Sequence, residues 1–78
     1  MSIRKHSLDY LWNKAISDKN KAQLSFELLL NNGVGIGDHS TGDYHENLDQ
    51  ALNMLVDATN RIEVLKKHYG KETDNSIV

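Results

Sequence analysis

The chain contains no cysteine and no proline, and each absence narrows what it can be. Without cysteine, neither disulfides nor thiolate-bound metals can stabilise its 78 residues. Without proline, no residue interrupts a long helix through the loss of a backbone N–H. A domain this small usually needs a disulfide, a bound metal or a partner subunit to be stable. We therefore expect either a metal site of histidines and carboxylates or self-association, and self-association is the commoner of the two.

Excess positive charge and long apolar runs are lacking too. The formal net charge of −2 and the pI near 6.0 argue against a general nucleic-acid binder, which would normally be basic. No apolar run approaches the about 20 residues of a membrane span. The charged residues 1–6 have no apolar region behind them, so we expect no secretory signal and a cytoplasmic location.

What the chain does have is a glycine-rich segment near its middle. Residues 33–42 hold four of the five glycines, which permit unusual backbone angles. They separate two amphipathic segments of similar length. The glycine-rich segment therefore predicts a loop that folds the chain back on itself.

The first amphipathic segment predicts a helix over about residues 7–32, with Ser7 as its N-cap and Gly33 as the residue that ends it. Polar residues 17–21 interrupt the apolar pattern, which then resumes in phase and favours one continuous helix. Lys19 then falls on the buried stripe, either at its edge or at a seam between subunits. The apolar residues that open the stripe are Leu8, Leu11, Trp12, Ala15 and Ile16.

The second amphipathic segment predicts a helix over about residues 43–69. Asp43 and Glu46 have the spacing of a capping box, and Asn47 with Gln50 offers the alternative start. The glycine that follows is the expected end of the helix. The apolar stripe consists of Tyr44, Leu48, Ala51, Leu52, Leu55, Ala58, Ile62, Leu65 and Tyr69.

Residues 1–70 are thus predicted to form one all-α domain, an antiparallel two-helix hairpin with its loop at 33–42, followed by a flexible tail over 71–78. A lone pair of helices leaves apolar flanks exposed to water. The flank residues expected to be exposed are Leu24, Leu28, Val56 and Val64. We therefore expect copies of the chain to assemble into a homo-oligomeric helical bundle.

An antiparallel hairpin brings the two chain ends together at one basic end. Because cations near a helix N-terminus oppose its dipole, Arg4 and Lys5 indicate an anionic ligand there, whose base an aromatic ring would stack. The candidate ligand-binding residues are Arg4, Lys5, His6, Tyr10, Trp12, Lys66, Lys67 and Tyr69. In the alternative interpretation, Trp12 and Tyr69 pack against other apolar residues and the cations are solvated.

The loop end carries carboxylates and imidazoles instead. Two histidines, His39 and His45, lie among acidic residues that suit zinc or a harder ion. Their spacing matches no established metal motif, and capping and turn chemistry explain the acidic residues, so we predict no metal and no cofactor. The glycines follow a helix and lack the Gly-Lys-Ser/Thr of a phosphate loop, although their N–H groups offer a second, lower-ranked anion site.

Catalysis is not expected. The sequence offers no nucleophile beside a base and an orienting group, and a two-helix unit has little concavity to exclude water. We therefore predict a binding protein rather than an enzyme.

Three runs carry a resemblance: Ala22-x-Leu-Ser-x-Glu-Leu-Leu, Gly35-Ile-Gly-Asp-His39 and Ala58-x-x-Arg61-x-x-x-Leu65. They resemble a group of small helical-hairpin proteins of tailed bacteriophages with a Gly-x-Gly-acid-His turn. The resemblance spans about residues 20–69. It implies a protein of the host cytoplasm that acts by binding, and it brings no catalytic residue.

Two functions remain as hypotheses. In the first, an oligomer binds a small anionic ligand at the basic end, a nucleotide or cyclic nucleotide, and thereby sequesters a signal of host defence. In the second, the hairpin is a protein-binding module that docks an apolar helix face on a host protein, as an inhibitor or a small assembly factor. Neither involves a membrane or general nucleic-acid binding.

Overall fold

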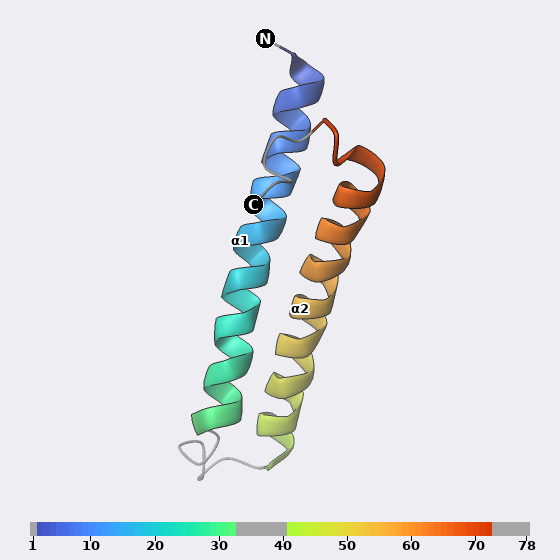
Figure 1. Cartoon of the computed structure of the whole chain (residues 1–78). Coiled ribbons are helices and arrows are strands. Elements are labelled where there is room, and N and C mark those ends of the chain that lie inside the picture. The colour runs from blue at the N-terminus through green and yellow to red at the C-terminus, as the bar shows by residue number, and fades with distance from the viewer. Residues whose placement is uncertain (1, 33–40, 73–78) are drawn as a thin grey trace.

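The computed structural model describes residues 2–32 and 41–72. They form two helices, α1 over Ile3–Asn32 and α2 over Thr41–Tyr69. The helices run antiparallel along each other for most of their length (Figure 1). Within these residues there is no strand, so the predicted all-α hairpin is confirmed.

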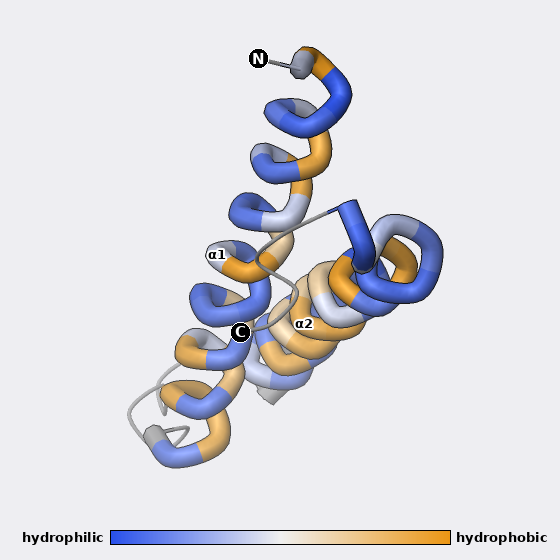
Figure 2. Tube along the Cα trace, turned by 45° about the horizontal axis from the view of Figure 1, so that its top comes forward, coloured by the Kyte–Doolittle hydropathy of each residue, from blue (hydrophilic) through white to orange (hydrophobic). Residues whose placement is uncertain are grey.

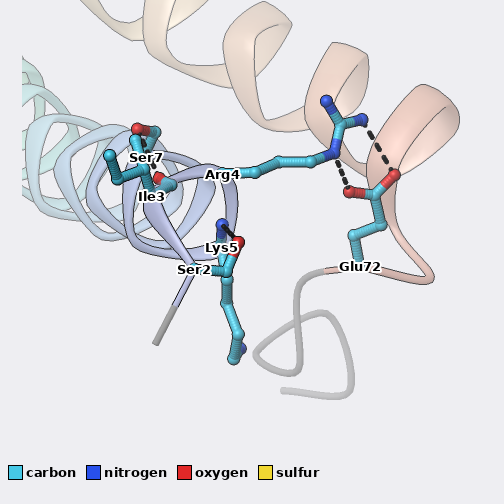
Figure 3. A network of polar contacts seen from close by, with 6 residues as sticks. All are labelled: Ser2, Ile3, Arg4, Lys5, Ser7 and Glu72. Atoms are coloured by element: carbon cyan, nitrogen blue, oxygen red, sulfur yellow. Dashed lines mark hydrogen bonds and ion pairs between the residues drawn. The ribbon is translucent and has the colours of Figure 1, made fainter.

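The start of α1 corrects the prediction that placed its N-cap at Ser7. The cap is Ser2, whose Oγ accepts a hydrogen bond from the backbone N–H of Lys5 at 3.2 Å (Figure 3). The carbonyl of Ser2 accepts from the N–H of His6 at 3.1 Å, which completes the N-cap geometry. Ser7 lies inside the helix instead, and its hydroxyl donates to the carbonyl of Ile3 at 2.8 Å.

The start of α2 also differs from the prediction, whereas the helix ends agree with it. Because α2 begins at Thr41, Asp43 lies in its first turn, where a carboxylate interacts favourably with the helix dipole. The helix α1 runs without a break through residues 17–21 and ends at Asn32, and α2 ends at Tyr69. The continuity of α1 is thus confirmed.

Small residues let the two helices approach closely. Fully buried apolar residues, each with an exposed fraction of 8% or less, are Leu8, Trp12, Ala15, Ala22, Ala51, Ala58 and Leu65. The alanines recur seven residues apart in each helix, so their short side chains face the partner helix turn after turn. Trp12 packs with Leu8 and Leu65 near the open end, where α1 begins and α2 ends. Lys19, on the same stripe, is half-buried, which fits its predicted place at the stripe edge.

The two-helix core leaves many large apolar side chains exposed. Those that are exposed are Ile3, Tyr10, Leu11, Leu24, Leu28, Leu30, Leu52, Met54, Val56, Val64 and Tyr69. The four predicted flank residues are among them, as are Leu11, Leu52 and Tyr69, which the apolar spacing had placed on the buried stripes. Hydrophilic residues alternate with apolar ones along both helices (Figure 2). Within the described ranges, neither helix has a stretch apolar enough to cross a membrane.

Candidate functional site

The first candidate site is the open end of the hairpin, where the first turn of α1 meets the turn after α2 (Figure 3). Arg4 donates from Nε to Oε2 of Glu72 at 2.6 Å and from Nη2 to Oε1 at 3.0 Å. Its guanidinium carbon also lies 5.7 Å from the centroid of the Tyr69 ring. The side chain of Arg4 therefore joins the start of α1 to the end of α2 through a bidentate ion pair and a cation–π contact.

The ion pair between Arg4 and Glu72 favours the charged form of both groups. The hydrogen bond from Arg4 lowers the pKa of the Glu72 carboxyl below its ordinary value. The same bond raises the pKa of the Arg4 guanidinium. Both side chains are exposed, so solvent and salt screen their attraction and the ion pair is easily broken.

The turn that follows α2 brings Glu72 back toward α1. The N–H of Glu72 donates to the carbonyl of Tyr69 at 2.9 Å, which closes the turn. A methyl group at Gly70 would collide with the main-chain carbonyl of Lys66. Glycine is thus required here by close approach, since no described residue has a positive φ.

Several predicted ligand residues gather at this end. A hollow of about 630 Å³ surrounds the last turn of α2. Its lining residues are Lys66, Lys67, His68, Tyr69, Gly70, Lys71 and Glu72. The lysines and Tyr69 of the prediction therefore share one surface, and Arg4 lies over the ring of Tyr69.

The other predicted ligand residues are placed differently. Trp12 is 5% exposed and packed in the core, so it cannot stack on a base, and the alternative interpretation as a core residue holds. Lys5 lies 3.4 Å from Asp9 in an ion pair one turn along α1. His6 and Tyr10 are exposed on α1, and neither lines the hollow at the end of α2.

Parts of the loop end lie outside the described residues, including the predicted helix stop at Gly33 and His39, one of the two histidines considered as metal ligands. Among the residues that are described, no three metal-ligating side chains form a group. The phenol of Tyr44 donates to the carbonyl of Leu29 at 2.8 Å. This bond ties the first turns of α2 to the last turns of α1, close to the loop.

The second candidate site is an apolar groove of about 340 Å³ between the helices. Its lining residues are Leu11, Lys14 and Ala15 of α1, and Asn60, Arg61, Val64 and Leu65 of α2. Ala15 and Leu65 are buried, whereas Leu11 is 46% and Val64 is 53% exposed. The groove therefore has an apolar floor and apolar walls that water still reaches.

Charges of both signs border the groove. Lys14 lies 2.9 Å from Asp18 on α1, and Arg61 lies 3.3 Å from Asp57 on α2. The hydrogen bond from Lys14 lowers the pKa of the Asp18 carboxyl, and the charge of Arg61 on the other helix adds to the effect. The apolar spacing gave no sign of this groove, because it assigned Leu11 to the buried stripe.

Comparisons of the chain with protein-family models, with curated proteins and with solved structures found no match. The resemblance to bacteriophage proteins therefore stays a prediction.

Proposed function

We propose that the chain is a non-enzymatic protein-binding module that acts through apolar side chains exposed on its helices. The observation that carries the proposal is the exposure of large apolar residues on both flanks of the hairpin, Leu11 and Val64 on one flank and Val56 on the other. Soluble monomers rarely leave wide apolar patches in water, and such patches are typical of protein interaction surfaces. An amphipathic helix of a partner is a usual occupant of such a surface.

The architecture favours binding over catalysis. The described residues form two helices in a single layer, and within them no second layer covers a reacting group to exclude water. The cations and carboxylates beside the groove pair within their own helices. They therefore suit the polar rim of an interface, which surrounds an apolar centre.

Capture from a bacterial lysate tests the proposal. Val56, 47% exposed on α2, is replaced by glutamate, and Asn53→Glu adds the same charge at a neighbouring exposed position as a control. We expect the wild-type chain and the control to retain one protein at stoichiometric yield, and Val56→Glu to lose it. Retention of no protein, or equal retention by all three chains, would reject the proposal.

A second candidate function is the binding of a small anionic ligand at the open end. The favouring observation is that Arg4 lies over the Tyr69 ring, beside the hollow lined by Lys66, Lys67 and Lys71. Cations next to an aromatic ring suit a phosphate attached to a base. Sequestering a nucleotide signal of host defence is also one of the three roles that the bacteriophage resemblance implies, beside inhibition of a host enzyme and assembly.

Titration calorimetry with a panel of nucleotides and cyclic nucleotides tests this second candidate. Because Glu72 holds the guanidinium that a phosphate needs, we expect Glu72→Gln to bind more tightly than the wild-type chain. Arg4→Gln should bind at least tenfold more weakly. Absence of heat from every nucleotide, with either chain folded, rules this candidate out.

A further inference from the structure

We propose that the groove flank binds a second copy of this chain. We define the groove flank as the side of the hairpin that carries Leu11, Lys14, Arg61 and Val64. The proposal rests on the proposed function, and it names the first partner and the surface that this partner covers. A two-fold axis perpendicular to the helices, midway between the levels of Lys14 and Asp18, packs each helix antiparallel on its own copy and closes a four-helix bundle.

The exposed area of the chain exceeds that of a compact monomer by enough to form one such interface. The chain exposes 5966 Å², whereas a compact monomer of 8.8 kDa exposes about 4,800 Å² according to the scaling of surface with mass. The excess of roughly 1,200 Å² exceeds the about 800 Å² that each partner buries in an interface of standard size. A hairpin with one flank covered has the exposed area expected of a compact protein.

The groove distinguishes this flank from the opposite one. Its walls, Leu11 and Val64, lie on different helices at the same level of the hairpin, as their shared hollow shows. With about 100° of rotation per residue, Leu28 and Met54 continue the flank toward the loop end. A two-fold axis perpendicular to the helices, midway between the levels of Asp57 and Arg61, places Val64 of each copy opposite Met54 of the other, so two apolar pairs form at once.

The charges of the flank are self-complementary. On α1, Lys14 and Asp18 lie one turn apart, and on α2 the same holds for Arg61 and Asp57. An axis perpendicular to the helices and midway between these levels places Lys14 of each copy opposite Asp18 of the other, and Arg61 opposite Asp57. A partner of one charge sign would leave half of these groups without a match, whereas a second copy supplies both signs.

Sedimentation of the purified chain tests the proposal at concentrations of tens of micromolar. Val64 is replaced by glutamate, and Val56→Glu adds the same charge at a similarly exposed position on the opposite flank of α2. We expect the particle mass of Val64→Glu to fall at least twofold below that of the wild-type chain. Val56→Glu should keep the wild-type mass, and circular dichroism should show equal helicity in all three.

Disulfide cross-linking provides a second measurement. The natural sequence has no cysteine, so any disulfide must come from the introduced residues. Single variants Met54→Cys and Val64→Cys, mixed and mildly oxidised, should form a covalent dimer between copies. Leu24→Cys, on the outer face of α1 and 62% exposed, should form none with either.

Three results would overturn the proposal: a wild-type chain of single mass, a Val64→Glu variant of unchanged mass, or cross-linking by Leu24→Cys as strong as by the mixed pair. If Val56→Glu alone lowers the mass, the second copy occupies the opposite flank. Protein binding in general would then stand. Failure of the proposed function is seen separately, as failure to capture a protein from the lysate.

Discussion

Arg4 and Glu72 show how single residues decide the geometry of the open end. The contact joins positions 68 residues apart in the sequence, one before the predicted start of the first helix and one in the predicted tail. The charges at α2's end have a separate role, since Lys66 and Lys67 stabilise the negative end of the helix dipole. The anion-binding interpretation of this end therefore depends on Arg4, whose charge the dipole does not explain.

Gly70 should tolerate no larger residue. In Gly70→Ala the added methyl group meets the main-chain carbonyl of Lys66, so the turn must open and carry Glu72 away from Arg4. We expect a loss of about 1 kcal/mol in the free energy of unfolding, measured by thermal denaturation. Lys71→Ala, one residue further along and exposed, is the control and should melt like the wild-type chain.

The carboxyl of Glu72 should report its contact with Arg4 during an acid titration. Arg4 lowers the pKa of this group from its ordinary value of 4.5. The stabilisation is therefore complete above pH 4.5 and is lost as the pH falls through the lower, folded-state pKa. We expect the NMR titration midpoint of Glu72 to rise toward 4.5 in Arg4→Gln. An identical midpoint in both chains would show that the two groups do not interact in solution.

At the scale of the helix, two serines near the N-terminus have opposite roles. Ser2 caps α1, whereas the hydroxyl of Ser7 bonds to a carbonyl inside the helix. Ser2→Ala should cost about 1 kcal/mol in the free energy of unfolding because a capping hydrogen bond is lost. Ser7→Ala should change stability little or raise it slightly. If Ser7→Ala is the more damaging of the two in chemical denaturation, the helix starts at Ser7 as the sequence predicted.

The buried alanines fix the spacing between α1 and α2. Ala22 is 1% exposed, and a leucine there would push the helices apart. Ala22→Leu should destabilise the hairpin by about 1–3 kcal/mol through overpacking. Gln23→Leu adds a leucine at the neighbouring exposed position and should be nearly neutral in the same urea denaturation. Equal effects of both substitutions would argue against close helix packing.

Periodicity predicts elements well and their ends less well, and this chain shows why. The in-phase apolar pattern on both sides of residues 17–21 predicted one continuous helix, because phase survives a polar interruption. The start was misplaced since Ser2 and Ser7 carry the same capping signal. The identity of the residue does not distinguish the two serines. The hydrogen bond from the backbone N–H of Lys5 to Ser2 shows that Ser2 caps the helix.

The candidate sites were harder to predict than the helices. Spacing placed both Leu11 and Trp12 near the stripe, and packing buries Trp12 while leaving Leu11 on the groove. Which neighbour is buried depends on the size of the residue opposite, and a pattern of one chain segment does not contain that information. The partner of Arg4 was missed for a similar reason, because residues after α2 have no periodicity.

At the scale of the whole molecule, the stability of this hairpin should depend on its concentration. Two helices alone bury few large side chains, and Trp12, Leu8 and Leu65 form the main apolar cluster of the described residues. If a second copy covers the groove flank, folding is coupled to association, and mass action raises the melting temperature as concentration rises. We expect a rise of several degrees from 1 to 100 µM, since a small domain shifts by about 4–8 °C for each kcal/mol.

The same measurement on Val64→Glu separates this coupling from general stability. The variant removes one apolar wall of the groove but leaves the helix interface intact, because Val64 is 53% exposed. Its melting temperature should equal that of the wild-type chain at the lowest concentration and stay constant as concentration rises. A wild-type melting temperature that is equally constant would mean that the hairpin folds alone, with its apolar flanks exposed to water.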